Sequence, residues 1–418
     1  MLNLHSSKIM VMNVEQLRSE FPELGEKVYG KQLVYLDNAA TSQRPLSVVR
    51  KWEDLSLKLN SNLHRAVHHI AALATEEYER TRDYVKEYLN ASCREEIIFT
   101  SGATASLNLV AYSFGEAFVK EGDEIIVTEA EHHSDIVPWQ LLCERKKAVL
   151  KYLHVDESGH LDTAELEALV SEKTKLVCVA HISNVLGLVN PVREIAGICH
   201  EKGCRLLVDG AQGIVHEVVD VQDLDCDFYV FSGHKVYSAP GVGVLYGRKE
   251  ILDRMPPFMS GGEMIATVKW NGTTFAPLPQ KFEAGTQNMA GVPTLIPALE
   301  LAKSLRDNEI DSQYNALRTY VYRELMHMPD VRLYGVPKTL DEKIALFSFT
   351  VKAAHHEDLA LILDKMGIAV RSGQMCAEPL MDRYGVTGML RASFAPYNTL
   401  AEAEYFISSL RKAIEMLK

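Results

Sequence analysis

Two short polar motifs, each directly after an apolar stretch, carry residues that could do chemistry together. VDGAQ spans residues 208–212 and contains Asp209, and FSGHK spans residues 231–235 and ends on Lys235. A buried lysine can form a Schiff base with an aldehyde, and a buried aspartate can keep a pyridine nitrogen protonated so that the ring accepts electrons. Alone, Asp209 could be a helix cap and Lys235 a surface lysine. Together they predict a site for an aldehyde cofactor with a pyridine ring.

A third motif offers an anion site. The segment SGAT, residues 101–104, stands between an apolar stretch and a segment with helical periodicity. Backbone N–H groups and the positive end of a helix dipole bind phosphate at such turns. The motif is not GxGxxG, and no dinucleotide-binding fingerprint occurs elsewhere in the chain, which disfavours a nicotinamide cofactor. The turn suits the phosphate of a pyridoxal-type cofactor.

Alternating apolar stretches and helical patterns must position these motifs. This alternation predicts an α/β fold with a large, mostly parallel seven-stranded sheet covered by helices on both faces. Asp209 and Lys235 fall at the carboxyl ends of their strands, where open parallel sheets bind ligands. The expected strands cover residues 95–101, 124–130, 148–155, 175–183, 205–212, 228–235 and 241–248, and the helices cover 104–120, 136–146, 161–172 and 191–203.

The pattern changes near residue 300. Helical segments dominate residues 295–328, shorter apolar segments follow, and the last helix begins with a capping box between Thr399 and Glu402. This pattern predicts a smaller α+β C-terminal domain. The expected division is an N-terminal arm at 1–34 that packs on the small domain, a large cofactor-binding domain at 35–305 and a small domain at 306–418.

Composition restricts the partners and the compartment. The chain has 418 residues and a formal net charge of -12, which argues against nucleic acid or an anionic membrane as a partner because both attract basic surfaces. No apolar run approaches the roughly 20 residues that span a bilayer, and the N-terminus lacks the pattern of a signal peptide. The seven cysteines are scattered and lack CxxC spacing, which is typical of thiols in a reducing compartment. We expect a cytoplasmic protein.

Taken jointly and in order, the motifs are specific for one family. The sequence resembles the class V aminotransferase group of fold-type I pyridoxal-phosphate enzymes, and more narrowly the group II, SUF-type (SufS-like) cysteine desulfurases, which are similar to selenocysteine lyases. The resemblance runs from about Val14 to the C-terminus. The matching stretches are YLDNAATSQRP (35–45), HRAVH (64–68), SGAT (101–104), TEAEHHSDIVPW (128–139), SNVLG (183–187), VDGAQ (208–212), FSGHK (231–235), GGEMI (261–265), FEAGTQN (282–288), RSGQMCAEP (371–379) and RASFAPYN (391–398).

The resemblance implies how pyridoxal 5′-phosphate would be held. Lys235 would carry the cofactor and Asp209 would pair with its ring nitrogen. His132, which by itself could be a satisfied core histidine, would stack on the ring and help in proton transfer. Gln212 would hydrogen-bond the phenolic oxygen.

The phosphate would have its own set of contacts. Thr286 would reach the phosphate of the neighbouring subunit, which implies a homodimer. The contacts within one chain would be the backbone of Ala103 and the side chains of Thr104, Ser232 and His234.

Substrate contacts also follow from the resemblance. Asn184 and Arg391 would hold the substrate carboxylate, for which an arginine fork is geometrically suited. Arg371 occupies the matching position of the family motif near the same site. His64 and Arg65 would line the entrance to the cavity.

Cys376 is the residue that distinguishes a desulfurase from other members of the group. It lies in RSGQMCAEP (371–379), where a loop is expected, and sulfur transfer needs a mobile thiolate that reaches the substrate sulfur. A lone cysteine is usually inert, so this assignment depends on the family register. Met375 stands where group II loops often have His, so no proton donor is assigned there. Ala103 stands where many relatives have Thr, and Ala105 stands where some relatives have Glu.

A metal site is not expected. His64 and His68 have the i, i+4 spacing of a metal-binding pair, with His69 beside them. No Asp or Glu completes a ligand set nearby, and the family uses no metal.

The implied activity is conversion of L-cysteine to L-alanine, with transfer of sulfur to a persulfide on Cys376 for iron–sulfur cluster assembly. The implied sulfur acceptor is a SufE- or SufU-like protein. Selenocysteine lyase activity would share every site residue and stays open as an alternative. A transaminase would not need Cys376, and a cofactor-free binding protein on the same fold would not need Lys235 or Asp209.

Overall fold

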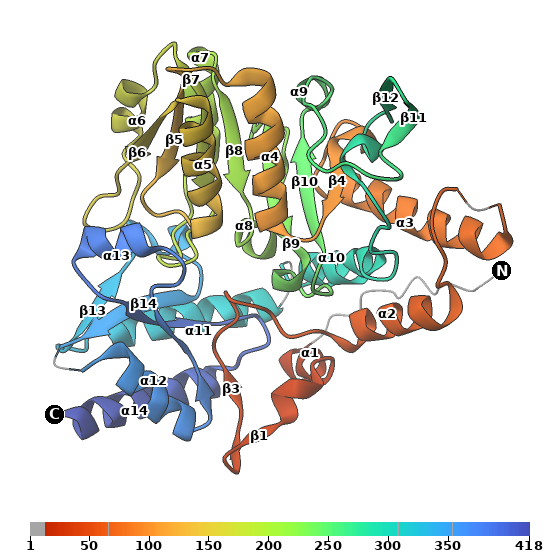
Figure 1. The fold of residues 1–418 in the computed structure, drawn as a ribbon. Coiled ribbons are helices and arrows are strands. Elements are labelled where there is room, and N and C mark those ends of the chain that lie inside the picture. Colours follow the sequence, from red (N-terminus) through yellow and green to blue (C-terminus); the bar gives the residue numbers. More distant parts are fainter. Residues whose placement is uncertain (1–12, 66, 307–308, 353) are drawn as a thin grey trace.

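The computed structural model describes residues 13–65, 67–306, 309–352 and 354–418. They form a large part built on a seven-stranded sheet and a smaller part built on a four-stranded sheet (Figure 1). The strands of the large sheet are β4 (Ile97–Thr100), β5 (Glu124–Thr128), β6 (Val149–Leu153), β7 (Thr174–Ala180), β8 (Arg205–Asp209), β9 (Phe228–Ser232) and β10 (Gly243–Gly247).

The large sheet is mostly parallel. Its strand order is β4-β10-β9-β8-β7-β5-β6, with parallel pairing from β9 to β6 and β10 antiparallel to both of its neighbours. Alternate side chains of a strand are buried on opposite faces. In β8, Leu206 and Val208 join one apolar cluster and Leu207 joins the other. Burial on both faces explains the near-continuous apolar sequence of these strands, and the predicted α/β fold is confirmed.

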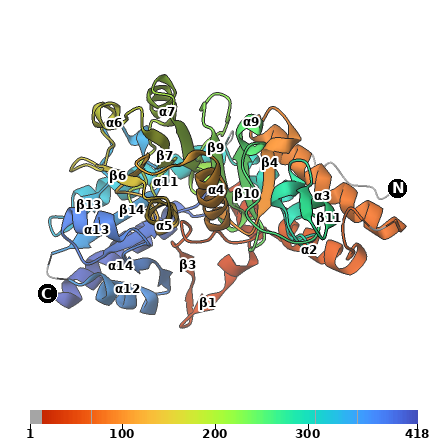
Figure 2. The same cartoon turned by 45° about the horizontal axis from the view of Figure 1, so that its top comes forward.

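Helices cover both faces of the large sheet. On one face, α4 (Ala103–Phe118) and α5 (Val137–Lys146) pack on the cluster that contains Leu207, and Figure 2 shows them side by side in front of the strands. On the other face, apolar side chains of several helices join the second cluster; they belong to α3 (His69–Tyr88), α6 (Thr163–Leu169), α7 (Val192–Glu201) and α10 (Leu295–Ser304). Within the described residues, no helix combines the length and the apolar character that crossing a membrane requires.

The smaller part is an antiparallel sheet with helices. Its strands are β13 (Val331–Tyr334), β14 (Leu346–Val351), β17 (Met389–Ser393) and β16 (Arg371–Gly373), in that spatial order. Its helices are α11 (Glu309–Met326), α12 (His356–Lys365), α13 (Glu378–Tyr384) and α14 (Leu400–Leu417). The predicted capping box of α14 is present, because Thr399 accepts from the Glu402 N–H and Glu402 accepts from the Thr399 N–H.

The N-terminal segment contacts the smaller part. Strand β3 (Val34–Tyr35) pairs in parallel with β15 (Ile368–Ala369). In α1 (Val14–Ser19), Arg18 forms a 2.9 Å ion pair with Glu402. These contacts support the proposed packing of an arm on the small domain, although the first twelve residues of that arm lie outside the described residues. The exact domain boundaries stay a prediction.

The remaining elements are short or peripheral. They are β1 (Lys27–Val28), β2 (Lys31–Gln32), α2 (Leu46–Lys58), α8 (Gly213–His216), α9 (Lys249–Leu252), β11 (Ile265–Lys269) and β12 (Gly272–Phe275).

Candidate active site

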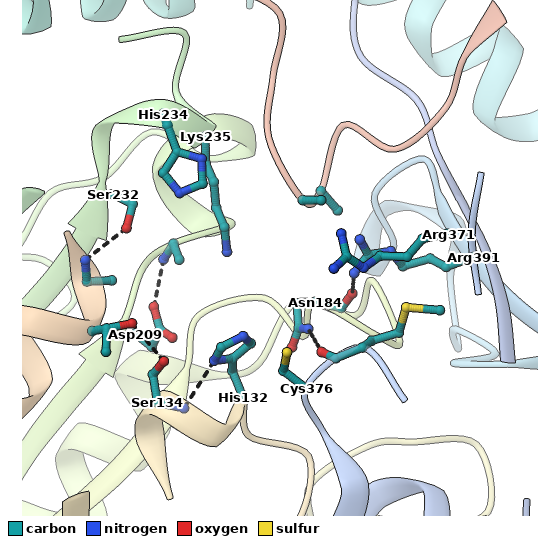
Figure 3. A pocket seen from close by; sticks show the side chains of 16 residues that line it. His132, Ser134, Asn184, Asp209, Ser232, His234, Lys235, Arg371, Cys376 and Arg391 are labelled. Carbon is teal, nitrogen blue, oxygen red and sulfur yellow. Dashed lines mark hydrogen bonds between the residues drawn. The ribbon is translucent and has the colours of Figure 1, made fainter. Parts of the chain in front are cut away.

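A cavity of about 210 Å³ opens where the carboxyl ends of the central strands face the smaller part (Figure 3). Residues that are distant in sequence line it together, and most were predicted as site residues. The lining consists of Ala39, Ala40, Ala103, Thr104, His132, Ser134, Asn184, Asp209, Ala211, Ser232, His234, Lys235, Arg371, Met375, Cys376 and Arg391.

Lys235 and Asp209 lie beside each other because their strands are neighbours. Asp209 is the last residue of β8 and Lys235 follows β9, which pairs in parallel with β8. Burial lowers the pKa of Lys235, while the nearby Asp209 carboxylate opposes that shift. Burial raises the pKa of Asp209, and Lys235 opposes it in turn. One oxygen of Asp209 accepts a 2.9 Å hydrogen bond from the Ala211 N–H, which fixes the carboxylate toward the cavity.

His132 presents a neutral imidazole to the cavity at neutral pH. Burial first, and then the charge of Lys235, lower its pKa to about 4. Its Nδ1 accepts a 3.1 Å hydrogen bond from the Ser134 N–H, so the ring proton sits on Nε2. A neutral imidazole with a fixed tautomer can stack on an aromatic ring and can also exchange a proton.

A buried pair of carboxyl groups lies behind His132. Glu131 accepts a 2.6 Å hydrogen bond from the Thr128 hydroxyl, and Asp135 accepts a 2.8 Å bond from the Trp139 indole. Burial raises the pKa of Glu131 to about 8, with a further contribution from the charge of Asp209. Burial also raises the pKa of Asp135 well above its usual range, together with the charges of Glu131 and Asp209. Burial therefore favours the protonated form of both carboxyl groups.

The predicted phosphate turn has the geometry of an anion site. Helix α4 begins at Ala103, so its first N–H groups face the cavity, and the Ala103 N–H donates to the Ser232 hydroxyl at 2.8 Å. The Thr104 and Ser134 hydroxyls lie 2.8 Å apart on the same side. Gly102 precedes the helix with a φ of 154°, a conformation that favours glycine.

His234 adds a second imidazole to this end of the cavity. Its Nδ1 lies 3.2 Å from the Thr41 hydroxyl. Burial lowers its pKa to about 4, so the ring is a neutral hydrogen-bonding group at neutral pH.

The donor set fits pyridoxal phosphate. A lysine amine, a buried carboxylate and a neutral imidazole surround one part of the cavity, and a helix N-terminus with hydroxyl groups forms another part. The first three can hold an aldehyde-bearing pyridine ring, and the helix end can hold its phosphate. Lys235, Asp209, His132, Ala103, Thr104, Ser232 and His234 all line this one cavity.

Two arginines form the wall contributed by the smaller part. Arg391 on β17 is buried, and its Nη1 donates to the Asn184 carbonyl at 2.8 Å. Its Nη2 lies 3.1 Å from one oxygen of Asp37, and Nη1 of Arg371 lies 3.3 Å from the other oxygen. The Nε of Arg391 is buried and has no hydrogen-bond partner among the described residues. The Arg391 side chain lines the cavity with a positive charge that an incoming carboxylate could meet.

The loop that carries Cys376 closes one side of the cavity. Met375 and Cys376 both have a φ of 56°, which is rare for residues other than glycine. The Asn184 amide donates to the Met375 carbonyl at 3.0 Å, and the His133 N–H donates to the Cys376 carbonyl at 2.7 Å. These bonds hold the backbone of the loop while the Cys376 thiol remains exposed, and Figure 3 shows its sulfur beside Asn184.

Four predicted site residues do not line the cavity. Gln212 donates a 2.8 Å hydrogen bond to the Ala39 carbonyl and so lies behind the cavity wall. Thr286 is exposed. The Nε2 of His64 lies 3.1 Å from Oε1 of Glu79, and Arg65 forms an ion pair of 3.0 Å with Glu263. Their predicted roles toward cofactor, partner subunit and substrate entrance stay predictions.

Two residues near the cavity were missed by the sequence analysis. The Ser134 N–H donates to His132, and its hydroxyl contacts Thr104 in the phosphate turn. Its position two residues after His132 could have indicated that it lies at the site. Asp37 contacts both arginines. It lies in YLDNAATSQRP, one of the stretches that carry the family resemblance, but no role was predicted for this residue. Among the described residues, no group of three or more His, Cys, Asp or Glu could hold a metal ion.

Comparisons with known proteins agree on one kind of enzyme. The family model for "Aminotransferase class-V" matches residues 34–406. The chain is 41% identical over 408 residues to a probable cysteine desulfurase of Vibrio cholerae, covering 98% of this chain and 100% of that one. It is 44% identical over 404 residues to a probable cysteine desulfurase of Halalkalibacterium halodurans, covering 97% and 98%. A solved cysteine desulfurase from Thermococcus onnurineus superposes with a TM-score of 0.90 at 37% identity, covering 97% and 99%.

Proposed function

The chain belongs to the class-V aminotransferase family and is a pyridoxal-phosphate-dependent cysteine desulfurase, and we propose that it transfers the sulfur of L-cysteine to Cys376. The observation that carries this proposal is the exposed Cys376 thiol on the same cavity as Lys235 and Arg391. A transaminase needs the last two residues but has no use for the thiol.

Lys235 and Asp209 have distinct tasks in this proposal. Pyridoxal phosphate, when bound, supplies an aldehyde that links to amines and a ring that stores the electrons left behind when a Cα proton leaves. Lys235 would hold the cofactor through its Nζ, and the same amine, when free, would accept the Cα proton of the substrate. The lowered pKa of Lys235 favours this, because its amine gives up a proton more readily than an exposed lysine. Asp209 would keep the ring nitrogen protonated, and His132 would pack against the ring.

Arg391 and Asn184 hold the substrate carboxylate. The Arg391 guanidinium lines the cavity, and it is already oriented by the Asn184 carbonyl. This orientation fixes the substrate Cα near Lys235 before any bond changes.

Cys376 receives the sulfur. Its thiolate forms an S–S bond to the substrate sulfur while the substrate C–S bond breaks. The electron pair of the broken bond stays with the substrate carbon, which takes up protons and leaves as L-alanine. Cys376 is left as a persulfide. No external oxidant is needed, because Cys376 accepts the sulfur and the substrate carbon retains the electron pair of the broken bond.

The finer assignments follow from the sequence resemblance. We infer that the chain is a SUF-type enzyme, a homodimer in the cytoplasm, and that its persulfide passes to a SufE- or SufU-like acceptor for iron–sulfur cluster assembly. The seven free cysteines are compatible with a reducing compartment. L-selenocysteine would fit the same cavity, so selenocysteine lyase activity is a second candidate.

The test is product analysis. Purified enzyme is incubated with L-cysteine and a thiol reductant, and alanine, sulfide and pyruvate are quantified. We expect alanine and sulfide in equal amounts. Lys235→Ala should abolish both products, while Lys249→Ala, an exposed lysine, should match the wild type. Pyruvate in place of alanine would contradict the proposal.

A second measurement tests the cofactor attachment. Borohydride reduction of the yellow holoenzyme should fix the cofactor covalently, and peptide mapping should find it on Lys235. A label on another lysine would overturn this assignment.

A further inference from the structure

His133 binds the loop that carries Cys376 at two points. Its backbone N–H donates to the Cys376 carbonyl at 2.7 Å, and its imidazole Nε2 accepts a 3.0 Å hydrogen bond from the backbone N–H of Glu378. Because Nε2 is the acceptor, the ring proton sits on Nδ1. A single residue of the large part thus holds the loop both at Cys376 and two residues beyond it.

The loop needs such restraints because its backbone has an unusual conformation. Met375 and Cys376 both have a φ of 56°, which is unfavourable for residues other than glycine and persists only where surrounding contacts impose it. The Asn184 amide holds the peptide before Cys376 through the Met375 carbonyl. His133 follows β5 and Asn184 follows β7, so these restraints come from the large part. Loss of one of them allows the backbone to relax and the thiol to turn away from the cavity.

We propose that the His133 imidazole is a positioning group for sulfur transfer, which keeps the Cys376 thiol at the cavity through its bond to the Glu378 N–H. This inference rests on the proposed function, in which Cys376 accepts the sulfur. His133 is not among the residues that line the cavity, so it acts on the loop and not on cofactor or substrate. The bond from its backbone N–H does not require the side chain, so only the bond to Glu378 depends on the imidazole.

His133→Ala removes the imidazole acceptor and keeps the backbone bond. The kcat for alanine production from L-cysteine should fall by roughly tenfold, which corresponds to about 1.4 kcal/mol and to the loss of one hydrogen bond. The dissociation constant of L-alanine, read from the cofactor absorbance, and Cα-proton exchange in D₂O should stay at wild-type values, because Lys235 and Arg391 are unchanged. His133→Gln, whose amide oxygen can accept in place of Nε2, should recover most of the activity.

Glu378→Pro breaks the same bond from the other end. Glu378 is the first residue of α13, a position where proline is tolerated because the N–H has no partner within the helix. The variant lacks the N–H that donates to His133, so its kcat should fall by the same factor. Glu378→Ala is the matched control. It loses the carboxylate that accepts from Gln374 at 3.0 Å but keeps the N–H, and it should match the wild type.

The double variant His133→Ala/Glu378→Pro distinguishes loss of the bond from damage at two separate places. If the bond carries both effects, the double variant loses no more activity than either single variant. Independent effects would multiply the two losses, and that result would overturn the inference.

Hydrogen exchange reports on the loop directly and without turnover. Peptides that cover residues 371–379 should exchange faster in His133→Ala and Glu378→Pro, and at the wild-type rate in Glu378→Ala. Wild-type alanine production by His133→Ala would overturn the inference. Parallel losses of L-alanine affinity and Cα-proton exchange in that variant would also overturn it, since the imidazole would then support the cofactor site beside His132.

Failure of the proposed function would look different. Cys376→Ala would then keep wild-type turnover of L-cysteine, whereas faster exchange of the loop in His133→Ala would still support the hold of His133 on the loop.

Discussion

The backbone carbonyl of Cys376 accepts a 2.7 Å hydrogen bond from the backbone N–H of His133. This bond ties the thiol-bearing loop of the smaller part to the turn that carries His132 in the large part. Neither atom belongs to the thiol side chain. Substitution of Cys376 should therefore leave the loop, the cavity and the cofactor contacts in place.

Cys376→Ala should separate binding from sulfur transfer. We expect the variant to bind the cofactor and L-cysteine and to exchange the Cα proton with solvent, because Lys235, Asp209 and Arg391 remain. Alanine production from L-cysteine should collapse, since C–S cleavage lacks its nucleophile. Proton exchange is followed by NMR in D₂O and alanine by chromatography. Wild-type turnover of L-cysteine by this variant would show that Cys376 is not the sulfur acceptor.

Selenocysteine should respond differently to the same change. Selenium is the better leaving group, so its elimination depends less on a protein thiol. Cys376→Ala should keep a larger share of its alanine production with L-selenocysteine than with L-cysteine. Lys235→Ala should lose both activities, because the base that moves the Cα proton is gone.

Thr286 offers a test of the homodimer. It is exposed and lies outside the cavity, so within a single chain its replacement should not affect cofactor binding. In the predicted dimer its hydroxyl reaches the partner's phosphate. Thr286→Val should then weaken pyridoxal-phosphate binding by about 1.5–3 kcal/mol, the range for a hydrogen bond to a charged group, and Thr286→Ser should not.

Equilibrium dialysis gives the cofactor affinity of both variants, and sedimentation gives the mass of the holoenzyme. A monomer at micromolar concentration with full cofactor occupancy would contradict the predicted dimer.

Glu131 should make the stability of the enzyme fall as the pH rises toward 8. Its pKa in the folded protein is about 8, against 4.5 for an ordinary glutamate, so between these values the folded state binds more protons than the unfolded state. Stability is then lost with rising pH. Glu131→Gln removes this loss, and its free energy of unfolding relative to wild type should increase by on the order of 1–2 kcal/mol between pH 6.5 and 8.5.

The measurement is urea unfolding of both holoenzymes across that pH window. His132 and His234 have lowered pKa values of about 4 and have lost their protons before the window begins, so they do not interfere. Glu121→Gln, at an exposed position, is the control. A parallel pH dependence of wild type and Glu131→Gln would show that Glu131 is ionised throughout.

The sequence predicts the cofactor end of the cavity well, for a physical reason. Asp209 ends a buried strand and Lys235 closely follows the next one. The apolar runs of both strands are visible in the sequence, and neighbouring parallel strands must bring their ends together. Thr104 and Ser232 stand in neighbouring motifs, and their contacts to the phosphate were implied by the family resemblance. The mostly parallel character of the large sheet was predictable on this basis, but its strand order and the antiparallel β10 were not.

Contacts that depend on tertiary structure alone were not predictable from local patterns. Asp37 meets Arg371 and Arg391 only because its segment bridges to the end of β17, and Gln212 turns to the Ala39 carbonyl instead of the cavity. The hairpin of β11 and β12 was also missed. Nearly all of its residues are exposed, so it lacks the alternating burial that signals a strand.

Gly243 provides a final test of the phosphate turn. A Cβ added at this position would lie only 2.4 Å from the Gly102 Cα and 2.5 Å from its N, and these backbone atoms cannot move without displacing the start of α4. Gly243→Ala should therefore displace the N–H groups that face the cavity, with a loss of pyridoxal-phosphate affinity of tenfold or more and destabilisation of roughly 1–3 kcal/mol. Gly197→Ala is the matched control, since it lies within α7 with nothing within 4 Å of the added Cβ. That change should leave the affinity unaltered and stabilise the fold by up to about 1 kcal/mol. Cofactor titration and urea unfolding measure both effects, and wild-type cofactor affinity in Gly243→Ala would show that the close approach of these glycines does not shape the phosphate site.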